Sequence, residues 1–339
     1  MSATRVYVAN AASGTLTVLA LDPAKGALQT LQTVAIGGMA MPIAISPDRC
    51  YLHVARRSAP LAVLSFEIDR RSGQLMPLGE TALAASMAYL ACDGSGRWLL
   101  AASYQGEQLA LLAIGKDGRP QAARQSIATG ASAHALLAGP GNRHAYATVL
   151  GADQVWQFSL DAAQGRLAAL QPATLAARPG AGPRHLVFHP SAPWAYLINE
   201  LDAGIDRLAV DAASGQLSYC DTVWALPPGC VGAPWAAEIR LSPDGRFLYA
   251  SERRSSTVSG FAIDTANGRL SPLGHWPTQA QPRGMAIDPS GRWLLVAGQL
   301  SHRLGVHRVD ADSGQLSAVA EHEVGQDPNW VEAIALPER

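Results

Sequence analysis

The stretch Gly180–Glu200, GAGPRHLVFHPSAPWAYLINE, predicts a β-hairpin. A short apolar run, Leu186–Phe188, is followed by the turn sequence His-Pro-Ser at 189–191 and then by a second apolar run. Short apolar runs separated by such turn residues are typical of paired strands. Arg184 stands at the start of the hairpin and Glu200 at its end, so we expect the two side chains to lie opposite each other at its open end.

The same hairpin recurs along the whole chain. A turn of the type Ser-Pro-Asp-Gly followed by an apolar strand appears in six places, 46 to 53 residues apart, which align at Pro47, Gly94, Pro140, Pro190, Pro243 and Pro289. A second turn, Asp-x-x-x-Gly-x-Leu or a weaker form of it, marks seven copies through Gly26, Gly73, Gly118, Gly165, Gly215, Gly268 and Gly314. A repeat of about 40–50 residues with four short strands is typical of a β-propeller blade.

Seven such blades account for all 339 residues as one all-β domain, 1–339. The two ends of the chain complement each other, because Arg5–Asn10 matches the second strand of a repeat and Asn329–Leu336 matches the first. We therefore predict that the C-terminal strand completes the N-terminal blade by pairing with Val6–Asn10, which leaves no open sheet edge. The longest loop, Trp224–Trp235, is expected to lie between blades.

Composition limits the classes of partner. The net charge is −1 and the isoelectric point about 6.8, which favours neither nucleic acid nor an anionic membrane. The N-terminus lacks the pattern of a signal peptide, and no apolar run reaches membrane-spanning length. The four cysteines form no Cys-x-x-Cys pair, so buried free thiols are expected. We expect a cytoplasmic protein, a monomer or weak homodimer, whose partner is a small molecule.

Two equivalent positions in the repeat carry the functional signal. The residue six before the aligned turn position reads Met41, Ala88, His134, Arg184, Ala237 and Arg283, with Asn329 in the last strand. The residue ten after it reads Arg57, Tyr104, Leu150, Glu200, Arg253 and Gln299, with Ala11 in the first strand. Because the first two strands of a blade run antiparallel, both sets are expected at one mouth of the central channel.

Charged side chains at this mouth interrupt otherwise apolar strands. Buried charge is costly unless it is paired or meets water or a ligand. One histidine and one carboxylate among several arginines favour a hydrolytic or proton-transfer site with an anion clamp. The alternative interpretation is a water-filled channel whose charges are merely solvated.

Four further histidines and three tryptophans receive structural interpretations. His185 follows Arg184 directly and is expected to pack on the opposite side of the strand. His189 lies in the turn and is expected to be structural. His302 and His307 have no carboxylate or cysteine at metal-ligand spacing, so no metal site is predicted. Tryptophans recur just after the turn and are expected to pack blades together, namely Trp98, Trp194 and Trp293.

With these motifs, the chain resembles the seven-bladed lactonase family, which includes bacterial propeller-type 6-phosphogluconolactonases and fungal carboxy-muconate cyclases. The resemblance covers essentially the whole chain and is carried by GAGPRHLVFHP (180–190), NEL (199–201), WAAEIRLSPDGRFLYASER (235–253), QPRGMAIDPSGRWLLVAGQ (281–299) and VGQDPNWV (324–331). It implies an active site in the channel mouth that needs no cofactor. By motif, its catalytic residues are His134, Arg184, Glu200 and Arg253, with Arg283 as a further family feature.

The resemblance implies hydrolysis of a sugar-acid lactone, with 6-phospho-D-glucono-1,5-lactone first. Unphosphorylated aldonolactones and muconate-type lactones stay open, since Leu300 stands where some relatives have a basic residue. An alternative of another class is a non-catalytic propeller that serves as an interaction platform. The charged mouth and the absence of Trp-Asp repeat dipeptides argue against it. A quinone-dependent dehydrogenase is disfavoured because such enzymes are usually exported.

The general base is either His134 or Glu200. We favour His134 as the proton carrier because histidine titrates near neutrality. The pKa of Glu200 is expected to be lowered by neighbouring arginines, so this carboxylate would orient water or bind hydroxyls. Arg184 is predicted to polarise the carbonyl, and Arg253 to help hold the acid or phosphate end. The remaining predicted substrate-binding residues are Arg57, Tyr104, Arg283, Gln299 and Asn329.

Overall fold

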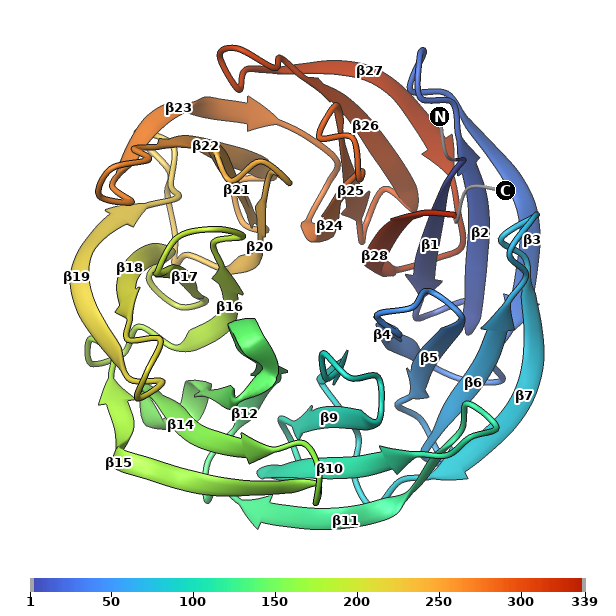
Figure 1. Ribbon diagram of the computed structural model, residues 1–339. Coiled ribbons are helices and arrows are strands. Elements are labelled where there is room, and N and C mark those ends of the chain that lie inside the picture. Colours follow the sequence, from blue (N-terminus) through green and yellow to red (C-terminus); the bar gives the residue numbers. More distant parts are fainter. Residues whose placement is uncertain (1–2, 337–339) are drawn as a thin grey trace.

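Seven four-stranded antiparallel sheets surround a central channel in the computed structural model, which describes residues 3–336 (Figure 1). In each blade the first strand borders the channel and the fourth lies at the periphery. The architecture is therefore the seven-bladed β-propeller that the repeat predicts.

The blades follow one another in chain order around the ring, and each has one strand at the channel and three further out. From the channel outward, blade 1 consists of β28 (Pro328–Ala335), β1 (Thr4–Asn10), β2 (Thr15–Leu21) and β3 (Leu28–Ala35). In the same direction, blade 2 consists of β4 (Ala40–Ile45), β5 (Tyr51–Arg56), β6 (Ala62–Ile68) and β7 (Leu75–Ala82). Blade 3 consists of β8 (Tyr89–Cys92), β9 (Trp98–Ser103), β10 (Gln108–Ile114) and β11 (Pro120–Ala128). Blade 4 consists of β12 (Ala133–Ala138), β13 (His144–Val149), β14 (Gln154–Asp161) and β15 (Arg166–Ala176).

The remaining three blades complete the ring. Blade 5 consists of β16 (Pro183–Phe188), β17 (Trp194–Asn199), β18 (Gly204–Val210) and β19 (Leu217–Trp224). Blade 6 consists of β20 (Ala236–Leu241), β21 (Phe247–Glu252), β22 (Thr257–Ile263) and β23 (Leu270–Pro277). Blade 7 consists of β24 (Pro282–Ile287), β25 (Trp293–Gly298), β26 (Arg303–Val309) and β27 (Leu316–Glu323). Within residues 3–336 the helical segments are two short 3-10 turns, η1 (Pro140–Asn142) and η2 (Leu150–Ala152), and neither could span a membrane.

Burial explains why the strands differ in sequence. The second strands, such as β9 and β25, are buried along their whole length because neighbouring blades pack on both of their faces. They therefore read as continuous apolar runs. The fourth strands, such as β27, are mostly exposed and bury mainly alternate residues, so they carry polar side chains.

The Asp-x-x-x-Gly turns join neighbouring blades. Tyr146 of blade 4 donates a hydrogen bond from its hydroxyl to the carbonyl of Gly215 in blade 5, at 2.7 Å. A Cβ added at Gly165 would lie 2.0 Å from the ring of Trp98 in the preceding blade, and the φ of Gly165 is +64°. Glycine is required there for both reasons. The recurring tryptophans Trp98, Trp194 and Trp293 all lie against such a turn glycine, which confirms their packing role.

The last strand closes the ring as predicted. β28 pairs antiparallel with β1, from Thr4 opposite Ala335 to Asn10 opposite Pro328. The N-terminal and C-terminal segments thus share one sheet (Figure 1). In blade 1 the strand next to the channel comes from the opposite end of the chain to the other three.

The strands that line the channel are bulged near one end. In six of the seven blades, the pairing between the first and second strands shifts by one residue at this point. In blade 5 the pairing moves from Pro183–Asn199 to His185–Ile198, so Arg184 is the extra residue. Bulges redirect side chains and are frequent beside active sites.

The cysteines are free, as expected, but they are not fully buried. Cys50, Cys92, Cys220 and Cys230 are each partly exposed. The expectation of buried thiols was wrong because these residues lie in turns and loops or on strands whose faces are only partly covered, such as β8 and β19.

Candidate active site

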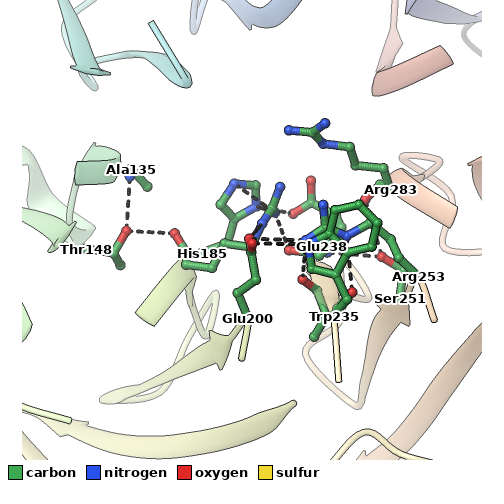
Figure 2. Close-up of polar contacts among 12 residues, drawn as sticks. Ala135, Thr148, His185, Glu200, Trp235, Glu238, Ser251, Arg253 and Arg283 are labelled. Carbon is green, nitrogen blue, oxygen red and sulfur yellow. Dashed lines mark hydrogen bonds and ion pairs between the residues drawn. The ribbon is translucent and has the colours of Figure 1, made fainter. Parts of the chain in front are cut away.

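Glu200 lies between two arginines at the channel mouth (Figure 2). Its Oε2 is 2.8 Å from Nε of Arg184 and 3.1 Å from Nη2 of Arg253. The backbone of the hairpin holds the carboxylate in place, because the Glu200 N–H donates to the carbonyl of Gly182 at 2.7 Å. The predicted meeting of Arg184 and Glu200 at the open end of the hairpin is confirmed.

Trp235 completes the surroundings of this carboxylate. Its indole N–H donates to Oε1 of Glu200 at 3.2 Å, and its ring lies 3.9 Å from the guanidinium carbon of Arg253. Trp235 ends the long loop that precedes β20 and was not among the predicted site residues. The feature of the sequence that could have identified Trp235 is the long loop itself, which lies directly after the last strand of the blade that carries Glu200.

The pKa of Glu200 lies below its usual value. Burial alone would raise this pKa, but the charges of Arg184 and Arg253 and the hydrogen bond from Arg184 outweigh it. The carboxylate is therefore ionised at neutral pH, as predicted, and is a weak base.

Arg184 is almost fully buried, yet one of its donors has no partner. Its Nε binds Glu200, and its Nη1 donates to the carbonyl of Ala237 in the next blade. Its Nη2 makes no hydrogen bond with any residue between 3 and 336. An arginine held by two contacts with a free third donor can bind an oxygen that carries developing negative charge.

Arg283 and Arg57 have no carboxylate partner among the described residues. Figure 2 shows the Arg283 guanidinium extending away from the other side chains drawn, without a dashed line to it. Burial, together with the charges of Arg184 and Arg57, lowers the pKa of Arg283 to about 10, so it is still charged at neutral pH. Arg57 contacts Ser86 and the sulfur of Met41. Uncompensated guanidinium groups are suited to bind an anion.

His134 is neutral in this setting. It is buried, and burial together with the charges of Arg184 and other neighbouring groups lowers its pKa well below the usual value. The argument that His134 titrates near neutrality was therefore wrong for the free protein. Its Nδ1 is buried without a partner among the described residues, so Nε2 is the nitrogen that can meet a substrate.

A second layer of side chains comes from the residue that follows the Arg184 position in the first strands of the blades. His185 sits between Tyr89, His134 and Trp330, with ring centroids at 5.2, 5.0 and 5.7 Å. Its Nδ1 is 2.9 Å from Oε1 of Glu238. These residues come from five blades, so the ring of His185 lies in the channel.

The prediction that His185 faces away from Arg184 was therefore wrong, although the residue is packed as expected. The bulge at Arg184 interrupts the two-residue alternation of the strand, so consecutive side chains both face the channel. Nη1 of Arg184 lies 3.3 and 3.2 Å from the two ring nitrogens of His185.

Glu238 is the main charged residue that the sequence interpretation missed. It is buried, and burial raises its pKa, while the charges of Arg240 and Arg184 only partly offset this effect. Arg240 in turn lies 3.2 Å from Glu332. Glu238 occupies the position in β20 that His185 occupies in β16, one residue after the arginine position of the repeat, so the same alignment could have identified it.

Replacement of Glu238 by glutamine should make stability less sensitive to pH. Between the unfolded and the folded pKa of a glutamate whose pKa is raised, the native state holds more protons, so wild-type stability falls as pH rises. The free energy of unfolding of the wild type decreases by about 1.4 kcal/mol for every pH unit that separates the two pKa values. The free energy of unfolding of E238Q relative to wild type should thus increase as the pH rises above the unfolded glutamate pKa of about 4.3.

Denaturant unfolding at several pH values measures this difference. The control is Glu321→Gln, because hydrogen bonds from Gln279 and Arg303 lower the pKa of the exposed Glu321. Its replacement should change the pH dependence of stability only below the unfolded pKa of about 4.3, with the opposite sign. A difference between E238Q and wild type that does not change with pH would contradict the interpretation.

The other predicted substrate-binding residues surround this centre. The ring of Tyr104 lies 6.1 Å from that of His134. Gln299 donates to Asp327 at 2.6 Å and accepts from Gln281, while Asn329 donates to the carbonyl of Asp327. Their amide donors thus hold the segment before β28, and the Oδ1 of Asn329 is buried without a partner among the described residues.

The other three histidines with predicted structural roles have structural contacts. Nδ1 of His189 accepts hydrogen bonds from the backbone of its own turn, and its Nε2 lies 3.1 Å from the carbonyl of Gly245. His302 accepts from the backbone of Asp327, and His307 contacts Thr278. Within residues 3–336, no group of three or more His, Cys, Asp or Glu side chains could hold a metal ion.

Known proteins share both the sequence and the fold. Residues 4–333 match the family model described as lactonase, 7-bladed beta-propeller. The chain is 39% identical over 331 residues to a 6-phosphogluconolactonase of Pectobacterium carotovorum, covering 98% of each chain. It is 37% identical over 330 residues to a 6-phosphogluconolactonase of Serratia proteamaculans, covering 97% of this chain and 98% of that one.

Among solved structures, a periplasmic gluconolactonase of Pseudomonas aeruginosa superimposes with a TM-score of 0.92. It is 29% identical, and the match covers 99% of this chain and 100% of that one. The family model and the full-length relatives lead to the same assignment, and the family model agrees with the ring of seven blades. The chain belongs to the family of seven-bladed β-propeller lactonases.

Proposed function

We propose that this protein hydrolyses a sugar-acid lactone, with 6-phospho-D-glucono-1,5-lactone as the first substrate. The observation that carries the proposal is the mouth itself. There, a carboxylate held between Arg184 and Arg253 lies near Arg283, and Arg283 lies near Arg57. Both of these last two cations lack a carboxylate partner among the described residues. The names of the full-length relatives support the same activity.

In the proposed reaction, water adds to the lactone carbonyl and forms a tetrahedral oxyanion. The bond between the carbonyl carbon and the ring oxygen then breaks, the ring oxygen takes a proton to become a hydroxyl, and the new acid ionises. The free Nη2 donor of Arg184 would stabilise the oxyanion. Glu200, ionised and fixed by three donors, would orient the attacking water.

His134 would accept the proton from water once an anionic substrate is bound. The charge of Arg283 is one of the causes that lower the pKa of His134. A phosphate or carboxylate on Arg283 would offset that charge and so raise the pKa of His134, while burial, the largest cause of its low pKa, would remain. The base would therefore become more effective when the substrate is in place, which restores His134 as the preferred proton carrier.

Proton release by the purified protein tests the activity. Each turnover yields one ionised acid, so a pH-indicator assay follows the reaction, and a parallel sample without protein corrects for spontaneous hydrolysis. The panel should include 6-phospho-D-glucono-1,5-lactone, D-glucono-1,5-lactone and a muconate-type lactone. We expect turnover of the phosphorylated lactone above background. Absence of turnover with all three would contradict the proposal and favour a non-catalytic propeller.

Loss of Arg283 or Arg57 should mainly weaken substrate binding. A hydrogen bond to a charged group contributes about 1.5–3 kcal/mol, so R283A and R57A should raise KM for the phosphorylated lactone about 10- to 100-fold. For the unphosphorylated lactone the increase should be smaller.

Steady-state kinetics with both lactones check this result. R308A is a matched control, because Arg308 is exposed on β26 and its loss changes the net charge equally. An equal rise in KM for both lactones would contradict a role in binding the phosphate.

A further inference from the structure

Two buried hydroxyl side chains occupy equivalent positions in different blades. Thr148 on β13 and Ser251 on β21 each follow the aligned turn proline, Pro140 or Pro243, by eight residues. Both are fully buried. They therefore share one place in the repeat, on the second strand of the blade.

Each hydroxyl joins the backbones of two neighbouring blades. Thr148 accepts from the N–H of Ala135 in its own blade at 3.0 Å and donates to the carbonyl of Arg184 in the next blade at 2.6 Å. Figure 2 draws both of these contacts. Ser251 accepts from the N–H of Glu238 at 3.0 Å and donates to the carbonyl of Arg283 at 3.3 Å.

The backbone groups involved lie at the bulges. Between β12 and β13 the pairing moves from Ala133–Val149 to Ala135–Thr148, and between β16 and β17 it passes over Arg184. A bulged residue leaves the regular ladder, so its carbonyl needs another partner. A buried carbonyl without one would cost about 1–3 kcal/mol. The hydroxyl supplies that partner and sets the orientation of the bulge.

A comparison of the equivalent positions shows that each hydroxyl occurs in the blade that precedes an arginine of the mouth. In the other five blades the same place is occupied by Ala9, Ala55, Ala102, Ile198 and Ala297. The bulge positions of the blades that follow those five carry Met41, Ala88, His134, Ala237 and Asn329. A hydroxyl thus stands before each of the two arginines, Arg184 and Arg283, and before no other residue of the set.

We propose that Thr148 and Ser251 are positioning residues, which fix the bulges from which Arg184 and Arg283 reach into the channel mouth. The kinetic consequences rest on the proposed lactone hydrolysis, and they differ between the two. Thr148 acts on Arg184, the arginine proposed to lie next to the carbonyl of the substrate. Ser251 acts on Arg283, the arginine proposed to bind the anionic group of the substrate.

The variants T148V and S251A test the proposal. Valine has the shape of threonine but neither donates nor accepts. A misplacement of about 1 Å costs up to about 10²-fold in rate, so T148V should lower kcat about 10-fold or more for phosphorylated and unphosphorylated lactones alike. S251A should instead raise KM for the phosphorylated lactone about 3- to 10-fold, with kcat nearly unchanged, since it loosens one charge-assisted contact. T148S restores the hydroxyl and should recover most of the wild-type kcat.

The matched control is S65A. Ser65 is also buried, but its hydroxyl binds the Nδ1 of His53 at 2.9 Å, away from the arginines of the mouth. S65A should lower thermal stability without changing kcat or KM. If T148V does not fold, T148A removes the same hydroxyl with a smaller side chain.

Crystal structures of T148V and S251A give a readout that does not depend on catalysis. We expect the Arg184 or Arg283 side chain to move by more than about 0.5 Å, the tolerance of a functional site. Unmoved arginines, or wild-type kinetics in both variants, would overturn the proposal. If the wild-type protein turned over no lactone, the proposed function would fail, and the crystal structures would still decide whether these hydroxyls position the arginines.

Discussion

The Arg184→Ala variant is expected to lose about 10²–10³-fold in kcat, the range measured when one donor to an oxyanion is removed. Arg184 is the residue that contacts both the carboxylate of Glu200 and the next blade, and its Nη2 has no hydrogen-bond partner among residues 3–336. Its loss would remove the donor for the oxyanion and leave Glu200 with Arg253 as its single ion-pair partner. KM should change much less than kcat, because the anion clamp remains.

Stability must be separated from catalysis in this experiment. Breaking a buried ion pair by removing one partner costs about 3–5 kcal/mol, so R184A is expected to unfold at a lower temperature as well. R207A is a matched control. Arg207 is buried in blade 5 and forms two hydrogen bonds to Asp221, at 3.0 and 2.7 Å, outside the channel. R207A should lose stability and keep its kcat.

Single-turnover and steady-state rates at a temperature where both variants are folded measure the effect. R184K, which keeps the charge and loses the planar fork, should recover only part of the activity. A kcat for R184A within a few-fold of wild type would show that the carbonyl is activated elsewhere.

A chain that ends at Asp327 is expected not to fold. This truncation removes β28, which supplies the innermost strand of blade 1 and pairs with the whole of β1. Trp330 and Val331, both buried, would be lost from the core. Burial of one large apolar side chain contributes about 1.5–3 kcal/mol, and the whole domain is stable by only about 5–15 kcal/mol. The exposed edge of β1 would in addition favour aggregation.

Circular dichroism, thermal unfolding and size-exclusion chromatography check this expectation. A chain that ends at Leu336 keeps all of β28 and serves as the control, which should unfold like the wild type. A cooperative transition near the wild-type temperature in the shorter chain would show that six complete blades and one incomplete blade suffice.

Much of the site followed from local sequence. Arg184 and Glu200 could be paired in advance because the turn of the hairpin determines its register, and register determines which side chains meet at its open end. The same alignment placed His134, Arg253 and Arg283 in one mouth because each blade repeats the same geometry. The alignment of the repeats did not reveal the bulges. One extra residue in a strand reverses the side to which the following side chain points. For that reason His185 was placed on the wrong side and Glu238 was missed.

The sequence by itself determined the number of blades, their order and the closure of the ring. These properties depend on turn residues, on strand alternation and on the match between the two ends of the chain, all of which can be recognised as patterns in the sequence. Beyond the Arg184–Glu200 pair, only the tertiary structure decided the charge states and partners in the channel. The neutrality of His134, the raised pKa of Glu238 and the free donor of Arg184 arise from burial and from charges on neighbouring blades. Such effects depend on distances between segments far apart in the chain, and these distances exist only once the ring has closed.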